Sequence, residues 1–199
     1  MTTEFKRAIL PNQLGRLVAF DHKVFRKSDW FTKSDWQNYE SYWMIVDGVA
    51  IGCCAFEHHV DFQDDPDRKN PPRRGSLFIA TTGILPRFQG KGFGHLLKCW
   101  QIVYAHNHGF NRIVTNHRKS NRPIIELNQK FGFKIIRRPK AKYFEDPPEP
   151  TVVMELRLPP KASRRTGESD SICPGRLPAR TPETWKSPPL RPLERDRER

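Results

Sequence analysis

The sequence predicts an α/β fold in which helices flank a mixed central sheet. Three observations predict it: two β-rich runs joined by a tight-turn signal, an apolar strand that leads through a glycine-rich segment into an amphipathic helix, and an alternation of strand and helix patterns beyond that point. Alternating strands and helices are typical of proteins whose helices cover the faces of one sheet. The 199 residues suffice for one domain of ordinary size.

The N-terminal elements follow from local patterns. A short strand is expected over residues 5–10, and Pro11-Asn12 then opens a helix whose apolar residues recur at helical spacing. A second short helix is expected after Thr32. The runs 41–46 and 49–56 form a hairpin, because the Asp47-Gly48 pair between them is a strong signal for a two-residue turn.

The second half alternates strands with helices. The main helix is expected over residues 90–108, where an apolar stripe recurs at helical spacing, and Gly109 ends it. The other expected elements are a strand over 76–84 before this helix and, after it, a strand over 112–115, a helix over 121–131, a strand over 133–136 and a closing strand over 151–158.

The most informative segment runs from Ile84 to Gly94, with glycines at 90, 92 and 94. Glycines let the backbone adopt tight conformations and let a ligand approach the N–H groups closely. A helix N-terminus also presents unpaired N–H groups and a positive dipole end, which together suit a phosphate. A flexible turn before a helix would show the same spacing.

Three segments in order resemble the GNAT acetyltransferase family, over roughly residues 4–158. Gln89, Gly92 and Gly94 fill the positions of its acyl-CoA-binding signature, in which Gln or Arg is followed by x-x-Gly-x-Gly or Ala. Residues 121–133 resemble its Asn, short helix and Lys-x-Gly-Phe element, and residues 143–156 resemble its closing strand. The resemblance implies a mostly antiparallel mixed sheet flanked by helices, and N-acetyl transfer from acetyl-CoA to an amine.

The resemblance also implies which residues bind acetyl-CoA. The family holds the pyrophosphate on the backbone of the glycine-rich turn and pairs the pantetheine arm with the preceding strand. The corresponding positions here are Ile84, Leu85, Gln89, Gly90, Lys91, Gly92, Phe93 and Gly94, with Asn121 and Asn128 added on the following helix. Asn121 matches the family's arm-contacting Asn, although Asn is equally suited to cap that helix. Arg87 and Lys91 bring charge near the phosphates, or are simply solvated.

The catalytic residues are harder to assign because the chain departs from the family twice. Asn128 stands where many members carry a Tyr that donates to the thiolate, and Ala80 stands near the position of a Glu base. We therefore expect Glu57 or His58, at the end of the third strand, to serve as base, and Tyr143 to replace the missing phenol. A polar strand end exposed to solvent and a Tyr packed on the sheet are the alternatives, and an amine can also lose its proton to bulk water.

The acceptor is expected to be a primary amine: a peptide N-terminus, a lysine or a small amine. The acidic loops 61–67 and 145–149 flank the side where family acceptors enter, and they would attract a cation, although solvated loops look the same. One alternative is a non-catalytic acyl-CoA-binding protein, which Ala80 and Asn128 suggest. Another is an RNA-associated protein acting on aminoacyl-tRNA; the net charge of +13 allows it, although no recognition motif supports nucleic-acid binding.

Composition divides the chain into a domain over 1–158 and a tail over 159–199. The tail holds eight prolines and few large apolar residues, so we expect it to be disordered and basic. No signal peptide or apolar run long enough to span a membrane is seen, which predicts a cytoplasmic protein with no membrane partner. The cysteines and histidines lack metal-ligand spacing, so no metal is expected. A monomer or a homodimer is expected.

Overall fold

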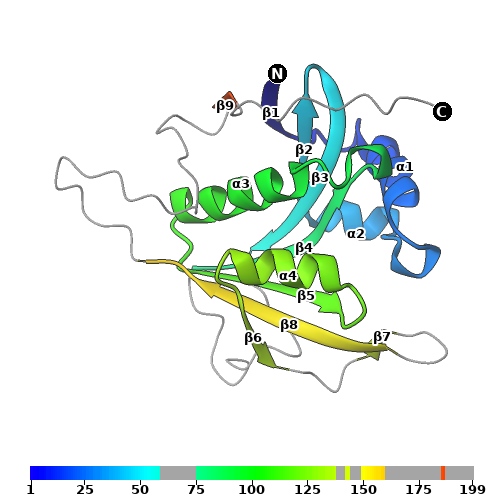
Figure 1. The fold of residues 1–199 in the computed structure, drawn as a ribbon. Coiled ribbons are helices and arrows are strands. Elements are labelled where there is room, and N and C mark those ends of the chain that lie inside the picture. Colours follow the sequence, from blue (N-terminus) through cyan, green and yellow to red (C-terminus); the bar gives the residue numbers. More distant parts are fainter. Residues whose placement is uncertain (59–74, 138–141, 144–148, 160–184, 187–199) are drawn as a thin grey trace, which may run out of the picture.

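The computed structural model describes residues 1–58, 75–137, 142–143, 149–159 and 185–186. One twisted sheet runs through the molecule with strand order β6-β8-β5-β4-β3-β2-β1-β9, and β7 pairs with β8 beside it (Figure 1). The strands are β1 (Thr2–Arg7), β2 (Glu40–Val46), β3 (Val49–His58), β4 (Ser76–Ile84), β5 (Arg112–Arg118), β6 (Lys134–Arg137), β7 (Lys142–Tyr143), β8 (Glu149–Arg157) and β9 (Trp185–Lys186).

The β4–β5 pair is parallel and every other described pair is antiparallel, which confirms the mixed, mostly antiparallel sheet. A parallel pair needs a crossover connection, and here the crossover is the helix α3 (Phe93–Asn107). The other helices are α1 (Leu14–Val24), α2 (Lys33–Asn38) and α4 (Arg122–Lys130), with 3₁₀ turns η1 (Lys27–Asp29) and η2 (Pro86–Phe88).

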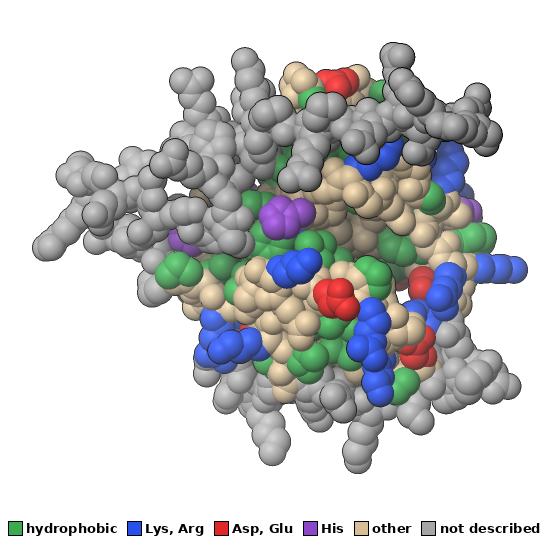
Figure 2. All heavy atoms as spheres, in the orientation of Figure 1, with side chains coloured by type: hydrophobic (Ala, Val, Ile, Leu, Met, Phe, Trp, Pro, Cys, Tyr) green, Lys and Arg blue, Asp and Glu red, His purple; other side chains and the backbone are tan. Residues whose placement is uncertain are grey.

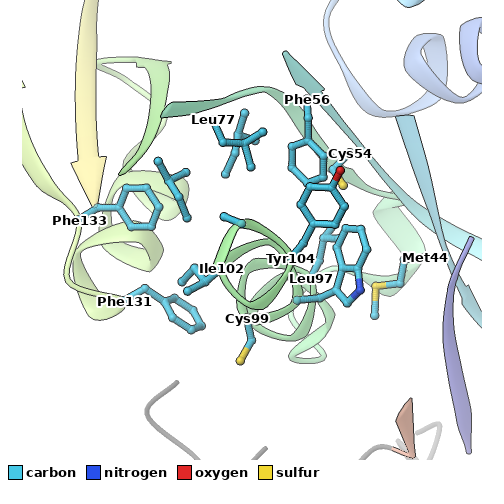
Figure 3. Packing of buried hydrophobic residues seen from close by; sticks show 14 of the residues in the cluster. Met44, Cys54, Phe56, Leu77, Leu97, Cys99, Ile102, Tyr104, Phe131 and Phe133 are labelled. Atoms are coloured by element: carbon cyan, nitrogen blue, oxygen red, sulfur yellow. The ribbon is translucent and has the colours of Figure 1, made fainter. Parts of the chain in front are cut away.

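The larger core lies between the sheet and the helices α3 and α4 (Figure 3). Leu97, Ile102 and Tyr104 of α3 pack there against Phe56 and Leu77 of the strands. The smaller core lies on the opposite face, under α1 and α2. The site discussed below lies in the middle of the sheet, so these two cores position it from both sides.

The boundaries of three elements differ from those expected from the sequence. The helix α3 begins at Phe93 rather than at residue 90, because Gly90 and Gly92 have φ angles of +73° and +85°, which are incompatible with a right-handed helix. The strand β1 begins at Thr2, three residues earlier than expected, because the Asp47 N–H bonds back to the Thr2 carbonyl at the hairpin turn. The strand β5 continues to Arg118, three residues beyond the expected end.

The proline-rich tail contributes one described element. Trp185–Lys186 forms β9, which pairs antiparallel with β1. The expected disordered tail otherwise lies outside the described part, which in residues 160–199 covers these two residues alone. None of the helices among the described residues is both long enough and apolar enough to cross a membrane.

Candidate active site

The sheet opens between its two central strands. β4 and β5 pair from Ser76–Arg112 to Ile79–Thr115, and no pairing between them continues past that point, although both strands do. The Thr115 hydroxyl closes the last pair by donating to the Ile79 carbonyl at 3.1 Å. Immediately afterwards Ala80 is an extra residue in the ladder to β3, a bulge that bends β4. The result is a split in the sheet, between the last residues of β4 and the last residues of β5.

The glycine-rich loop lies at the open end of this split, directly after β4. Within the described part of the chain, the N–H groups of residues 90–95 donate to no backbone carbonyl, and the first bond into the helix is from Leu96 to the Gly92 carbonyl. Six consecutive N–H groups at a helix N-terminus form an anion-binding cradle. Arg87 and Lys91 lie over the Phe88 ring beside the loop, at 4.9 and 5.9 Å from its centroid, and add positive charge.

The side chain of Gln89 folds back from the loop onto the strand. Its Nε2 donates to the Ile84 carbonyl at 2.8 Å, which fixes the loop against the end of β4. The neighbouring Leu85 uses both its backbone groups within the protein, since its N–H bonds to Ile51 and its carbonyl accepts from Phe88. Because Leu85 faces β3, the backbone of Ile84 faces the split. Of the two predicted arm-pairing residues, Ile84 is the one whose backbone is turned toward a ligand.

The two asparagines predicted to bind the cofactor differ in environment. Asn121 is exposed at the N-terminus of α4, and its side chain makes no capping bond, so it is available to a ligand. Asn128 is fully buried, and its Nδ2 lies 2.7 Å from His117 Nε2 and 3.8 Å from the Met154 sulfur. Its Oδ1 has no hydrogen-bond partner among the described residues.

The predicted catalytic residues Glu57 and His58 point to opposite faces of the sheet, as neighbours in a strand must. His58 lies toward α3 and its Nε2 is 3.0 Å from Glu40, so it forms an ion pair when protonated. Glu57 lies toward α2 and close to Tyr39, whose pKa is raised first by burial and then by the Glu57 charge. Its carboxylate is half-buried without a partner among the described residues, and burial raises its pKa. Of the two predicted residues, Glu57 is therefore the one that lies on the face covered by α1 and α2.

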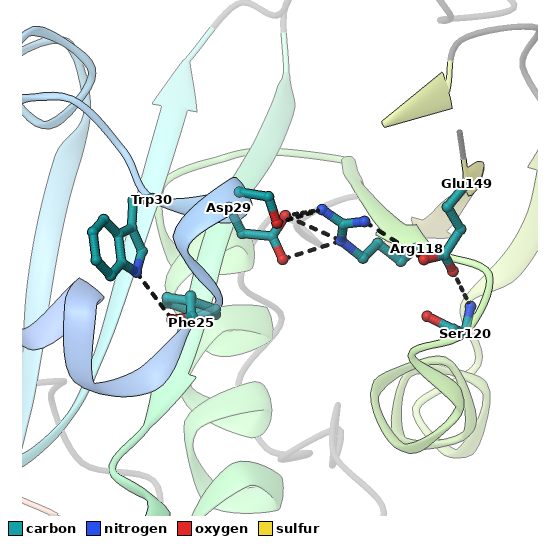
Figure 4. Close-up of polar contacts among 7 residues, drawn as sticks. Phe25, Asp29, Trp30, Arg118, Ser120 and Glu149 are labelled. Atoms are coloured by element: carbon teal, nitrogen blue, oxygen red, sulfur yellow. Dashed lines mark hydrogen bonds and ion pairs between the residues drawn. The ribbon is translucent and has the colours of Figure 1, made fainter. Parts of the chain in front are cut away.

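An ion-pair cluster lies on the α1 and α2 face, beyond the end of the split (Figure 4). Arg118, buried at the end of β5, donates from Nε to both Asp29 oxygens at 3.0 Å and reaches Glu149 Oε2 at 3.5 Å. Hydrogen bonds from Ser120, and then from Arg118, hold the pKa of Glu149 below its ordinary value. The cluster joins η1 to β5 and β8. Tyr143 lies opposite Glu149 in the β7–β8 pairing, and its side chain is outside the described part.

Comparison with known proteins identifies the family of this chain. The sequence model of the Acetyltransferase (GNAT) family matches residues 12–133, more than half of the chain. The chain belongs to the GNAT acetyltransferase family. As a member, it is an N-acetyltransferase that uses acetyl-CoA as the acetyl donor.

Solved structures share the fold of this acetyltransferase at low sequence identity. A ribosomal-protein-alanine N-acetyltransferase from Escherichia coli matches with a TM-score of 0.63 and 14% identity, over 78% of this chain and 94% of that one. An acetyltransferase from Bacillus subtilis in complex with CoA matches at 0.59 and 18%, over 78% and 99%. Ard1 from Thermoplasma volcanium matches at 0.61 and 13%, over 79% and 99%. The curated proteins compared contain no sequence match.

The residues present fit acetyl-CoA. The N–H groups of residues 90–95, which have no backbone partner in the described part of the chain, suit a diphosphate, and the two cations beside them supply charge of the right sign. The Ile84 backbone at the edge of the split offers strand-like pairing to an extended arm.

Sequence reasoning missed two side chains near the split. His117 on β5 lies beyond the expected strand, and Lys98 is one of the buried residues of α3 although it is not part of the expected apolar stripe. Lys98 is completely buried, its Nζ has no hydrogen-bond partner among the residues that the structure describes, and burial lowers its pKa to about 7. Its helical spacing from Gln101 and Ile102 could have placed it on the core face.

Proposed function

We propose that this acetyltransferase moves an acetyl group directly from acetyl-CoA to a primary amine. The observation that carries the proposal is the split between β4 and β5, which ends on six N–H groups that bond to no backbone carbonyl of the described residues. A donor bound there by its diphosphate would lie along the β4 edge, and its thioester would point back toward Ala80 and Thr115. The reacting carbon would then sit inside the sheet, open to the opposite face.

The amine enters from the face covered by α1 and α2. There the half-buried Glu57 is the described carboxylate with no partner of its own, so it is suited to hold the cationic amine and to accept its proton, directly or through a water. Burial raises its pKa and makes it a better base than an exposed Glu. The Asp29 carboxylate, by contrast, is already neutralised by Arg118.

The acceptor class remains a primary amine: a peptide N-terminus, a lysine or a small amine. Structural neighbours carry names from each end of this range, such as NatC bound to Gag peptide and a phosphinothricin N-acetyltransferase. These names describe those proteins, and their common feature is an amine. The remaining predictions are a contribution from Tyr143, a cytoplasmic location and a monomeric or homodimeric state.

The nucleic-acid alternative is less well supported than direct amine acetylation. On the face shown in Figure 2, Lys and Arg side chains are interspersed with Asp and Glu rather than gathered in one continuous stripe. A basic stripe is the feature that would favour RNA. Salt dependence separates the cases, since RNA binding weakens steeply as salt rises.

The test is release of CoA thiol from acetyl-CoA in the presence of three amine classes: peptides with free N-termini, lysine-containing peptides with blocked N-termini, and polyamines. We expect amine-dependent release with one class, and Glu57→Gln to lower kcat roughly tenfold to a hundredfold. Glu4→Gln, on the outer strand β1, is the matched control. Tight CoA binding without release for any amine would instead identify a non-catalytic acyl-CoA-binding protein.

A further inference from the structure

His117 and Asn128 meet at the inner end of the split, where β5 leaves β4. His117 is the second residue after Thr115, the last residue of β5 that pairs with β4. It lies on the face of the sheet covered by α4, since its Nε2 is 2.7 Å from the Asn128 Nδ2 on that helix. Asn128 occupies the position at which many members of the family carry a phenol. The imidazole therefore lies beside the place of the missing donor.

The neighbours of Asn128 fix which atom donates. Its Nδ2 faces both His117 Nε2 and the Met154 sulfur, and a thioether can accept a hydrogen bond but never donate one. The reversed carboxamide would place an oxygen against that sulfur, so the amide nitrogen belongs where it is. The Thr115 hydroxyl lies 3.4 Å from the same imidazole nitrogen, but it donates its hydrogen bond to the Ile79 carbonyl. His117 Nε2 is consequently the acceptor, and the ring proton resides on Nδ1.

The imidazole is also neutral. Burial, followed by the nearby Lys98, lowers the pKa of His117 to about 3. Lys98 on α3 is the described titratable group that acts on it, and no described carboxylate faces it. Nδ1 has no hydrogen-bond partner among the described residues, and the residue keeps some exposure to solvent, so this N–H is available to a ligand in the split.

We propose that His117 is a catalytic residue that donates its Nδ1–H hydrogen bond to the thioester sulfur, and that Asn128 is the positioning residue that holds it in this tautomer. The inference rests on the proposed function. The amine nitrogen bonds to the carbonyl carbon, the C–S bond breaks, and its electron pair stays on sulfur. The amine proton goes to Glu57 or water. The imidazole keeps its own proton, and solvent protonates the thiolate. A neutral imidazole is a known electrostatic donor of this kind.

The test compares His117→Ala, His117→Gln and Asn128→Asp with wild type, using His106→Ala near the far end of α3 as the matched control. We expect His117→Ala to lower kcat by about a hundredfold with CoA affinity unchanged, since one preorganised donor has about that effect. His117→Gln restores part of the rate, because an amide can donate but cannot act as a base. In Asn128→Asp the carboxylate accepts from Nε2–H, so ¹⁵N NMR should show the proton moved from Nδ1, with a similar loss of kcat.

The outcomes are separable. Wild-type rate in His117→Ala, or a ring proton on Nε2 in the wild-type protein, overturns the inference while leaving the proposed function intact. Equal loss in His117→Ala and His117→Gln overturns it in favour of a base. No transfer by the wild-type protein with any amine class overturns the proposed function, and the role of His117 with it. Circular dichroism of each variant establishes that it is folded, and CoA titration separates binding from turnover.

Discussion

Replacing Lys98 by Met should stabilise this acetyltransferase, which is an unusual result for a fully buried residue. Within the described part of the chain the Lys98 Nζ has no hydrogen-bond partner, and burial lowers its pKa from 10.5 to about 7. The unfolded chain holds the proton up to about pH 10.5, whereas the folded chain begins to lose it near pH 7, so folding weakens proton binding at Lys98. At about 1.4 kcal/mol per pKa unit, this costs about 4 kcal/mol at pH 7. Methionine fills similar space without a charge.

The pH dependence gives the sharper test. Between pH 7 and 10.5 the unfolded state binds more protons than the folded state, so the stability of the wild-type protein rises with pH and that of Lys98→Met does not. Their difference should shrink from about 4 kcal/mol at pH 7 to about 2 kcal/mol at pH 9, measured by urea unfolding. The contact of Nζ with the Phe133 ring at 5.3 Å stabilises the charged form and would reduce the gain.

Exposed Lys130→Met, at the end of α4, is the control and should change stability by less than about 0.5 kcal/mol. If Lys98→Met is no more stable than the wild-type protein at pH 7, and the difference does not depend on pH, then the ammonium is satisfied inside the protein and the reasoning is refuted.

Three further predictions concern the donor site and the α1 and α2 face. Gly94→Ala should fold, because its added Cβ meets only Leu127 at 3.8 Å, yet weaken CoA binding at least tenfold in calorimetry; unchanged affinity would remove the cradle from the donor site. Burial raises the pKa of Asp21 from 3.8 to about 6, so wild-type stability should fall by about 2 kcal/mol from pH 4 to 6.5, and Asp21→Asn should abolish that fall in urea titrations. Arg118→Met should lower stability by about 3 kcal/mol, since it strands Asp29; a loss under about 1 kcal/mol would mean the cluster is solvated.

The elements that the sequence predicted well are those whose signals are local. The Asp47-Gly48 turn needs two residues with positive φ, and both have it, at 47° and 80°. The strand, glycine loop and helix from 76 to 107 were predictable for the same reason: an apolar run and glycine spacing need no distant partner to be recognised. The capping box of α2, in which Thr32 and Asp35 bond reciprocally, is equally local.

The site itself depends on contacts that no local pattern contains. Arg118 meets Asp29 across 89 residues of sequence, and His117 meets Asn128 because a strand and a helix pack together. The polar residues at the end of β5 concealed the strand's true length, since they line the split instead of a core. The sequence alone, by contrast, could have placed Glu57 and His58 on opposite faces of the sheet, because neighbouring residues of a strand point to opposite sides.

The central claim is that acetyl-CoA is held on the N–H groups of the glycine loop at the open end of the split. Amide NMR of the ¹⁵N-labelled protein during CoA titration tests it most directly. The account predicts that the largest saturable shifts occur at residues 90–95 and at Ile84, with small changes in β1 and β2. Saturable binding with those amides unmoved, and shifts centred elsewhere, would contradict it.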